Sequence, residues 1–299
     1  MKDYDDICVS IVIPTYNRKE TLQQTLKALF NQSYPKDKYE IIVVDDGSTD
    51  GTEEMIDELI NKSPCKLKYL HQKNQGPAVA RNNSIKSSEG KIILFTDDDC
   101  VPEIDWISKH VKWYEKDIIG VGGLLISKNE TLLDKMDYYR YKEQYVDRKL
   151  VYNPILLGTA NCSYKREILA EVGGFDESFP FPGGEDGDLA TRILRFGKTV
   201  VDPNIIVYHL RKNELSMSKI KQWFRNGRGD LLYRRKHGAL RCYQLAVPLV
   251  TAGKTFIYAK NVFKDEKLNA LPICILYFVR EVIADAGLLR EYILSRRKY

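Results

Sequence analysis

Short apolar runs alternate with helical patterns along the first 95 residues of this chain, and this alternation limits its fold more than any other feature. The apolar runs are Val9–Ile13, Glu40–Val44, Lys66–His71 and Lys91–Phe95. Strands that alternate with short helices predict βαβ units and a parallel sheet. Because crossovers between parallel strands are right-handed, we expect the doubly wound order 3-2-1-4, in which the first and fourth strands are neighbours.

Helical spacing of apolar residues predicts the connections between these strands. Between Leu22 and Phe30 the apolar residues recur at i, i+4, i+7 and i+8, which is typical of one buried helix face. A second helix carries its apolar face in Met55–Ile60, and Ser48–Asp50 offers caps for it. A third helix is expected over Ala78–Ser88. The fold class is therefore predicted to be α/β.

A polar cluster follows each predicted strand. The clusters are Pro14–Arg18, Asp45–Ser48, Gln72–Gly76 and Asp97–Asp99. The carboxyl ends of parallel strands meet at one edge of a sheet, and ligands bind there. We therefore expect these four clusters to converge on one site.

Three consecutive carboxylates, Asp97–Asp99, come directly after the apolar run Ile92–Phe95. Adjacent carboxylates repel one another unless a cation lies among them. Their oxygens suit a hard divalent ion, Mg²⁺ or Mn²⁺, and such an ion often binds together with phosphates. The alternative is an acidic turn that is solvated or that only caps a helix.

The chain lacks the glycine loops that usually hold phosphates. No G-x-G-x-x-G follows the first strand and no G-x-x-x-x-G-K-[ST] occurs, which argues against a nicotinamide dehydrogenase. A phosphoaspartyl domain would use Asp45 and Asp46 but would leave Asp97–Asp99 without a role. The acid cluster and its metal would then have to neutralise a diphosphate.

Charge is divided unevenly along the chain. Residues 1–209 carry 27 Lys and Arg against 34 Asp and Glu, whereas residues 210–299 carry 19 against 7. This division predicts an acidic domain over 1–210 and a basic, mostly helical region over 211–299. Apolar stretches beside the basic residues favour helices that lie on an anionic membrane, and a solvated helix face is the alternative. No nucleic-acid recognition motif accompanies the basic residues, so no nucleic-acid partner is expected.

The remaining sequence features concern the cellular compartment of the protein. Met1–Asp6 is acidic and polar, and the apolar run Leu271–Val279 is too short to span a bilayer. The six cysteines are widely separated and are expected to be reduced. We expect a cytoplasmic protein associated with the inner face of the plasma membrane.

Together, the motifs resemble those of the family 2 glycosyltransferases of the GT-A fold, a Rossmann-like fold of nucleotide-diphospho-sugar transferases. The resemblance covers residues 8–210. The motifs that carry it, in chain order, are Val9–Asn17, Val43–Thr52, Ala80–Asn82, Asp97–Asp99, Gly173–Asp176 and Gly184–Leu189.

The resemblance implies transfer of a sugar from a nucleotide-diphosphate donor, UDP in the first instance, with inversion at the anomeric carbon. It implies that Asp46 contacts the uracil ring, that Asp97 lies near the ribose and that Asp99 binds the divalent metal. The residues expected to bind the nucleotide sugar are Pro14, Thr15, Tyr16, Asn17, Asp46, Asn74, Arg81, Asp97, Asp98 and Asn161. The expected metal ligands are Asp99, Asp97 and His209.

The catalytic pair implied by the resemblance is Asp186 and Glu185. An inverting transfer needs a carboxylate that accepts the proton of the acceptor hydroxyl. Asp186 matches the family's base, and Glu185 is expected to orient or bind the acceptor. In the alternative interpretation, Glu185 and Asp188 only cap a helix that starts near Leu189.

Other assignments also have structural alternatives. Arg81 is expected to counter phosphate charge or to form a salt bridge, and His209 is either a ligand or a structural residue. Asn161 and Ser163 resemble the stretch that borders the donor sugar, yet both suit a strand edge as well. The Tyr-rich segment Tyr138–Tyr152 is expected to form acceptor-side loops, and packing of the Tyr rings is its alternative.

The expected acceptor is a hydroxyl of a glycan, a lipid-linked saccharide or a cell-envelope polymer, as the family resemblance implies. The alternative function is that of a catalytically degenerate subunit that binds nucleotide sugar within a polysaccharide assembly complex. Metal-dependent nucleotide binding and turnover distinguish the two.

Overall fold

The structure is a computed structural model that describes residues 8–127, 131–141, 150–154, 158–179, 183–210, 214–238, 247–266 and 270–296. The chain forms two compact units. The first unit comprises residues 1–128, 149–180 and 186–211, and the second comprises 129–148, 181–185 and 212–299.

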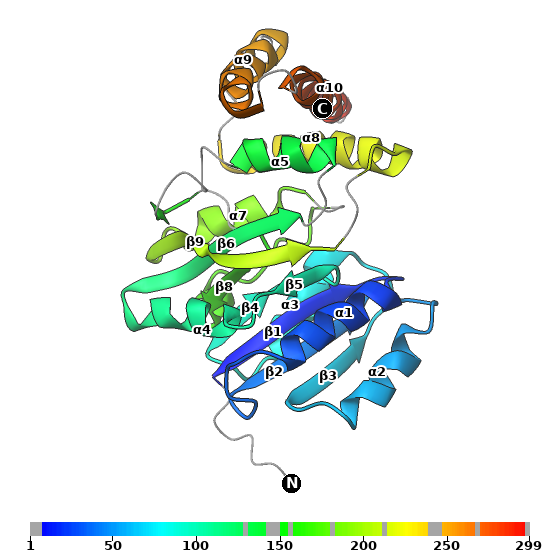
Figure 1. Ribbon diagram of the computed structural model, residues 1–299, viewed down its shortest axis with the longest axis vertical. Helices are drawn as coiled ribbons and strands as arrows, with labels where there is room; N and C mark the ends of the chain where they lie inside the picture. The colour runs from blue at the N-terminus through cyan, green and yellow to red at the C-terminus, as the bar shows by residue number, and fades with distance from the viewer. Residues whose placement is uncertain are drawn as a thin grey trace. The chain divides into compact units, whose positions relative to one another are not determined.

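A single mixed sheet forms the centre of the first unit (Figure 1). Its strands in the described residues run in the order β3-β2-β1-β4-β8-β6-β9-β5, and β7 pairs with β9. Their bounds are β1 (Val9–Thr15), β2 (Tyr39–Asp45), β3 (Lys66–His71), β4 (Ile92–Phe95), β5 (Cys100–Pro102), β6 (Ile118–Ser127), β7 (Val151–Tyr152), β8 (Cys162–Lys165) and β9 (Lys198–His209).

The predicted order 3-2-1-4 is confirmed, and β1–β4 are mutually parallel. Strand β8 then enters antiparallel between β4 and β6, so the far half of the sheet is mixed. Pro14 is tolerated in the central strand β1 because the pairing of β1 with β4 ends at Val12. The edge reached by the carboxyl ends of β1–β4 therefore carries the polar clusters predicted from the sequence.

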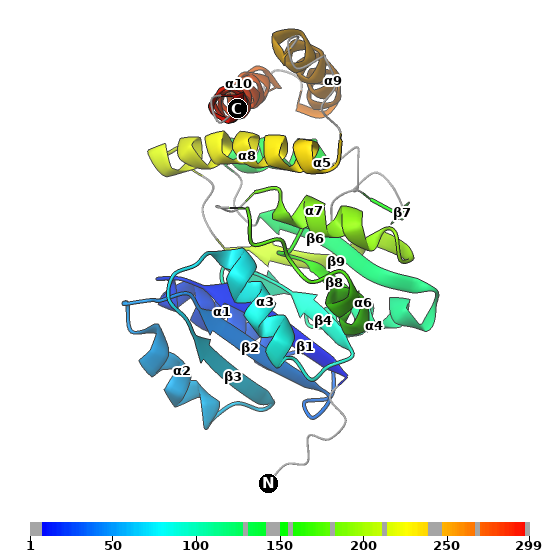
Figure 2. The ribbon, with the colours of Figure 1, turned by 180° about the vertical axis from the view of Figure 1, so that it is seen from behind.

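Helices cover both faces of this sheet. In Figure 1 helix α1 lies in front of the strands, and Figure 2 shows α3 in front of them from the opposite side. Right-handed crossovers account for this, since the chain moves outward through α1 and α2 and returns through α3. The described helices of this unit are α1 (Lys19–Phe30), α2 (Thr52–Ile60), α3 (Pro77–Ser87), α4 (Trp106–Val111), the short 3₁₀ helix η1 (Lys112–Glu115), α6 (Arg166–Glu171) and α7 (Glu185–Ile193). The first residue of α7, Glu185, is assigned to the second unit, and the rest of the helix belongs to the first.

Asp50, from the predicted cap of α2, contacts the starts of two helices. Helix α2 follows Gly51, whose φ of 83° is left-handed. The Asp50 carboxylate accepts a hydrogen bond from the hydroxyl of Thr52, the first residue of α2, at 2.6 Å. It also accepts one from the Lys19 backbone N–H at 2.9 Å, which satisfies a donor at the start of α1. The loops after β1 and β2 are joined in this way.

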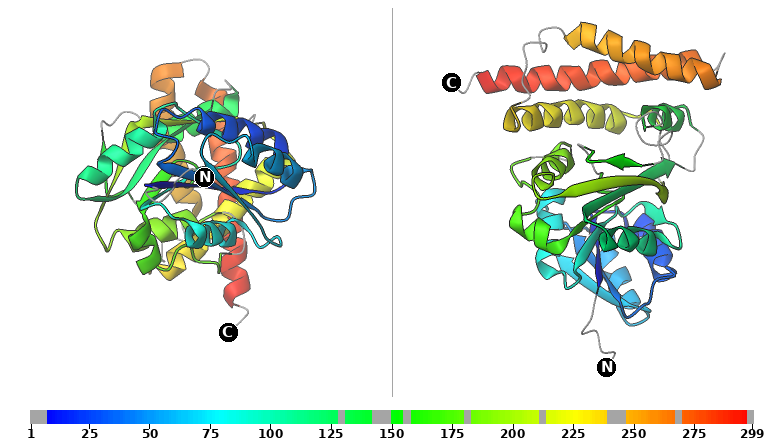
Figure 3. Two further views of the ribbon diagram at one scale, coloured as in Figure 1. Left: turned by 90° about the horizontal axis from the view of Figure 1, so that it is seen from below. Right: turned by 90° about the vertical axis from the view of Figure 1, so that its left-hand side faces the viewer.

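The second unit is helical, as the sequence predicted for the region after residue 210. Its helices are α5 (Leu132–Tyr141), α8 (Met217–Lys236), α9 (Val247–Glu266) and α10 (Ala270–Arg296). Their core includes Met136, Trp223, Val262 and Ile273. Figure 3 shows α9 and α10 alongside each other, as their contacts require.

Close helix packing in this unit depends on glycine. A Cβ at Gly227 of α8 would lie 1.6 Å from the Ala284 carbonyl oxygen, and one at Gly287 of α10 would lie 2.0 Å from that of Phe224. Only residues without a side chain permit the two backbones to approach this closely. In the described part of the chain, no helix is long and apolar enough to cross a membrane.

The expectation of acceptor-side loops over Tyr138–Tyr152 is corrected in part. Tyr138 and Tyr139 lie in α5, where Tyr139 packs in the core of the second unit. Lys135 pairs with Glu266 at 2.9 Å, which ties α5 to α9. The stretch 142–149 lies outside the described residues, and Val151 and Tyr152 form β7.

Candidate active site

The three carboxylates after β4 have different hydrogen-bond partners. Asp98 is buried, and its oxygens accept hydrogen bonds from Thr15 Oγ1 at 2.8 Å and from an Arg18 guanidinium nitrogen at 2.9 Å. Burial raises the pKa of Asp98 to about 6, although the charge of Arg18 opposes this shift. Asp98 therefore anchors the turn to the end of β1. The structure reassigns it from donor binding to support of the site.

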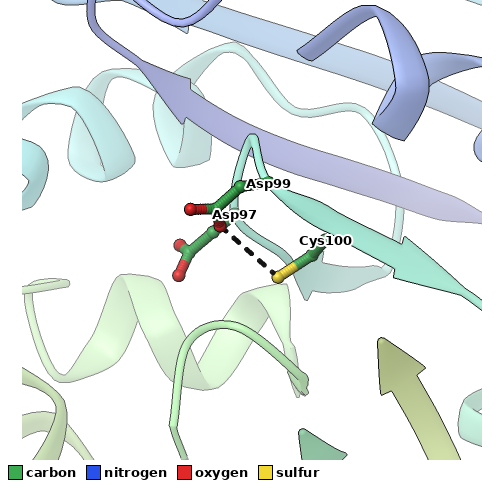
Figure 4. Close-up of side chains that lie close together, drawn as sticks. All are labelled: Asp97, Asp99 and Cys100. Atoms are coloured by element: carbon green, nitrogen blue, oxygen red, sulfur yellow. Dashed lines mark hydrogen bonds between the residues drawn. The ribbon is translucent and has the colours of Figure 1, made fainter. Parts of the chain in front are cut away.

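Asp97 and Asp99 lie close together and near Cys100 (Figure 4). One ligand atom from each of the three lies within 4.8 Å of the others. Carboxylate oxygens at this spacing suit a divalent cation. Burial, together with the neighbouring charges of Asp97 and Asp99, raises the pKa of the Cys100 thiol, so the oxygens are the better ligands for a hard metal.

Electrostatics at Asp97 also fits a bound cation. Burial raises the pKa of Asp97, the Asp99 charge adds to this, and Arg81 and His209 partly offset it. A divalent ion would relieve the cost of holding both carboxylates in the charged form. The residues present therefore fit the divalent metal that the sequence predicted.

Two cationic or ionisable side chains contact Asp99. Arg18 lies 2.9 Å from its Oδ2 atom, and His209 Nε2 lies 3.4 Å from its Oδ1 atom. His209 is the last residue of β9, and its partner in the β5 register is Cys100. The structure thus brings His209 to the acid cluster, as predicted. Burial opposes the charge of Arg18, but Asp98 and Asp99 hold the pKa of the guanidinium above its usual range.

Arg81 connects the acid cluster to the predicted base. Its guanidinium lies 3.3 Å from Asp97 Oδ1 and 3.8 Å from Asp186 Oδ1. The guanidinium also lies over the Phe175 ring, 5.5 Å from its centre. Asp186 further accepts hydrogen bonds from the Thr159 backbone N–H at 3.3 Å and from its hydroxyl at 3.2 Å. Residues from α3, from the turn after β4 and from α7 therefore converge on one place.

Two acids at the start of α7 bond to nearby groups of the chain. Glu185 is the first helical residue, and its carboxylate accepts a hydrogen bond from the Gly183 backbone N–H at 2.6 Å. Asp188 is fully buried and pairs with Arg192 at 2.9 Å. These two acids stabilise the segment, and the helix begins four residues earlier than predicted.

Asp46 holds the loop after β3. It is buried and accepts hydrogen bonds from Gln72 Nε2 at 2.8 Å, from the Gln75 N–H at 2.8 Å and from the Gly76 N–H at 2.9 Å. A carboxylate offers about four acceptor positions, so these bonds leave room for one more donor. Asn74 lies exposed in this same loop.

The loop after β1 lies against the loop after β2. Asn17 has a left-handed φ of 52°, donates its N–H to Ser48 Oγ at 2.8 Å and accepts from the Thr49 N–H at 2.8 Å. Tyr16 beside it is exposed. Pro14, Thr15, Tyr16 and Asn17 thus reach the sheet edge predicted to hold the base.

Asn161 belongs to the core rather than to a donor pocket. Its amide group donates to the backbone oxygens of Leu124 and Ile205, and its Oδ1 atom accepts from Trp106 and from His110. These bonds use all four hydrogen-bonding positions of the side chain. The structure therefore reassigns Asn161 to the interior, where it joins β6, β8 and β9.

Ser163 extends the same buried network. Its hydroxyl lies 2.8 Å from His110 Nδ1 and 2.8 Å from the Tyr114 hydroxyl. Burial lowers the pKa of His110 to about 4, so the ring is neutral at neutral pH.

Two residues of the site were missed by the sequence reasoning. Arg18 was noted only as part of a polar cluster, and Thr159 only as part of the stretch before Asn161. Arg18 follows a strand end that predicted the site edge, and this position could have identified it. Nothing local to Thr159 indicates that it would meet Asp186, which is 27 residues later.

The family model described as "Glycosyl transferase family 2" matches residues 10–173. This match covers more than half of the chain, which therefore belongs to glycosyl transferase family 2. The architecture is that of the GT-A fold. The most similar solved structures include a mannosyltransferase from Pyrobaculum calidifontis in complex with GDP-Man and Mn²⁺. That comparison has a TM-score of 0.71 at 19% identity and covers 98% of this chain and 89% of that one.

Curated relatives agree with this assignment. Glycosyltransferase AglE of Haloferax volcanii is 32% identical over 178 residues, which cover 56% of this chain and 55% of that protein. A Methanococcus voltae protein is 27% identical over 288 residues and 86% of each chain. It is named dolichyl N-acetyl-alpha-D-glucosaminyl phosphate 3-beta-D-2,3-diacetamido-2,3-dideoxy-beta-D-glucuronosyltransferase. The chain spans about half the length of AglE and 17% of the Staphylococcus aureus relative TarS.

Proposed function

We propose that this protein is an inverting glycosyltransferase that moves a sugar from a nucleotide-diphosphate donor to a hydroxyl group of its acceptor. The observation that carries the proposal is the position of Arg81 between Asp97 and Asp186. Arg81 links the acid cluster, which suits a metal and a diphosphate, to the Asp186 carboxylate, which suits proton transfer. Membership of glycosyl transferase family 2 supports the reaction class.

In this proposal Asp97 and Asp99 hold the divalent ion, and His209 supports Asp99. When bound, the metal neutralises charge on the departing diphosphate. Arg81 and Arg18 are cations beside the same cluster, and they supply further positive charge toward the phosphates. The loops that contain Pro14–Asn17, Asp46 and Asn74 hold the nucleotide, and UDP is the first donor to test.

Asp186 is proposed to be the general base. Inversion requires the acceptor oxygen to attack the anomeric carbon from the face opposite the diphosphate while its proton passes to a carboxylate. The hydrogen bonds from Thr159 fix the orientation of Asp186. Glu185, which precedes it in the chain, is proposed to orient the acceptor.

The acceptor is proposed to be a lipid-linked saccharide. The name of the Methanococcus voltae relative describes transfer to a dolichyl-phosphate-linked sugar, and the basic region after residue 210 suits an anionic surface. Nothing among the described residues favours the alternative of a degenerate binding subunit.

A panel of UDP- and GDP-sugars, assayed for hydrolysis with Mn²⁺ and with EDTA, tests this function. We expect metal-dependent release of one nucleoside diphosphate. Hydrolysis of none of the donors, together with nucleotide binding that does not respond to metal, would contradict the proposal.

A further inference from the structure

Helix α10 exposes a row of large apolar side chains. Apolar side chains on its surface are exposed at Leu271 (58%), Ile275 (53%), Phe278 (45%), Val282 (46%) and Leu289 (42%). Their spacing of four, three, four and seven residues places them on one side of the helix. A water-facing helix would carry charged residues at these positions.

Two charged residues lie on the buried side of α10, which also carries the core residues Ile273 and Tyr277. Arg280 is 9% exposed and Glu281 is 7% exposed, and the two contact each other. Lys254 of α9 lies 3.4 Å from the Glu281 carboxylate. Buried charges are tolerated because they are paired. Helix α10 therefore buries an ion pair together with one apolar side, while its other apolar side chains remain exposed.

Helix α9 adds aromatic and cationic groups to the surface of this unit. Phe256 is 76% exposed and Phe263 is 48% exposed. Lys260 and Lys264 are also exposed, and the positions 256, 260, 263 and 264 share one side of a helix. The exposed apolar residues of α10, with Phe256 and Phe263, are here named the outer face.

The lysines of α9 indicate what covers the outer face. Lys260 and Lys264 are exposed in the same helix as Phe256 and Phe263. Exposed apolar side chains in this number mark an interaction site. Apolar side chains combined with lysines are the composition of helices that lie in the interface of an anionic membrane. A contact with another protein would bury the apolar residues but would leave the exposed lysines beside Phe256 and Phe263 without a role.

We propose that the outer face lies on the surface of a membrane that contains anionic lipids, with α10 parallel to the membrane plane. A spanning arrangement is excluded for α10 by its central charges, Arg280, Glu281 and Asp285, and no helix in the described residues has the length and apolarity to cross. The Phe, Leu, Ile and Val side chains enter the headgroup region, while the lysines contact lipid phosphates. This inference concerns the second unit alone and does not depend on the proposed transferase activity.

Co-sedimentation of the full chain with vesicles tests the proposal. One set of vesicles contains phosphatidylcholine and phosphatidylglycerol, and the other contains phosphatidylcholine alone. We expect binding to the anionic vesicles that is at least roughly tenfold stronger and that weakens in high salt. The proposal would be overturned if the chain bound neither set of vesicles.

Two exposed positions of α10 supply the test variant, Ile275→Glu with Phe278→Glu. Binding to anionic vesicles is expected to fall by roughly tenfold or more, because two apolar groups are replaced by anions. Ile104→Glu is the matched control, since Ile104 is 65% exposed and lies in the first unit. The control is expected to bind like the wild type, and equal binding by the double variant would overturn the proposal.

A second variant, Phe256→Glu in α9, tests the same surface independently, in case the double variant misfolds. Its binding to anionic vesicles is also expected to fall, and circular dichroism measures whether each variant is folded. Lys260→Gln with Lys264→Gln is expected to reduce the preference for anionic over neutral vesicles. Light scattering measures the oligomeric state and so tests the alternative, in which a second copy of the chain covers the outer face. A wild-type dimer that the double variant converts to a monomer, without vesicle binding by either protein, would assign the outer face to self-association.

Discussion

Arg81 Nη1 lies 3.8 Å from Asp186 Oδ1, and the same guanidinium pairs with Asp97 at 3.3 Å. One buried cation thus connects a carboxylate at the end of β4 to one at the start of α7. The two acids are 89 residues apart in the sequence, and each would repel the other without a positive charge between them. This relationship underlies the first prediction.

Replacement of Asp186 by Asn is expected to abolish transfer and to leave donor binding nearly unchanged. Asn keeps the shape and can still accept the Thr159 hydrogen bonds, but it cannot take up a proton. The turnover number should fall by about 10²–10⁴-fold, the range for loss of a general base. Asp37→Asn, at an exposed position, is the matched control. Wild-type turnover in the Asp186→Asn protein would remove the base assignment.

Replacement of Asp99 by Asn is expected to weaken nucleotide binding in the presence of Mn²⁺. The variant loses an anionic ligand and leaves Arg18 and His209 without a charged partner at this position. Titration calorimetry with UDP and GDP, with Mn²⁺ and with EDTA, measures the effect. The difference between the two conditions should shrink by about tenfold or more, as expected when a group that orients or binds a metal is lost. A wild-type protein whose affinity is the same in EDTA would refute the metal role.

The neutral His110 makes stability depend on pH. Its pKa is lowered from 6.5 to about 4, so between these values the unfolded chain binds a proton that the folded chain does not. The free energy of unfolding should therefore decrease as the pH falls through this window, by about 2 kcal/mol at pH 5. Urea denaturation at several pH values measures this. His110→Gln should show a shallower pH dependence, and His71→Gln, at an exposed position, should match the wild type.

Replacement of Gly287 by Ala is expected to destabilise the second unit. The new methyl group would lie 2.0 Å from the Phe224 carbonyl oxygen, which forces α8 and α10 apart. Overpacking of this kind costs about 1–3 kcal/mol or more. Thermal unfolding with limited proteolysis of the C-terminal helices measures the effect. Ala286→Ser, at the exposed neighbouring position, is the control, and equal stability of the two variants would contradict the close packing.

Local patterns in the sequence determined the first four strands of this protein and the position of its candidate active site. The apolar runs predicted β1–β4 and their order, and the residues after each run predicted the edge of the sheet where Asp97, Asp99 and Arg81 meet. The hydrophobic periodicity and the strand order are enough to predict this edge, because parallel βαβ units place the carboxyl ends of all their strands at one edge of the sheet. Asp186 and His209 were assigned from the family resemblance, and the fold brings His209 to Asp99 and Asp186 to the Arg81 side chain that pairs with Asp97.

Side-chain direction and burial were decided by tertiary structure. Nothing local separates Asp98, whose carboxylate accepts a hydrogen bond from Thr15, from the acids on either side of it. The sequence suggests that Asn161 is a polar strand residue, yet contacts with α4, β6 and β9 make it a core residue. The exposure of a second apolar side of α10 is equally invisible to periodicity, since a helical repeat does not show which apolar residues are covered by the protein. Those choices depend on partners that are far away in sequence and that only the folded chain brings into contact.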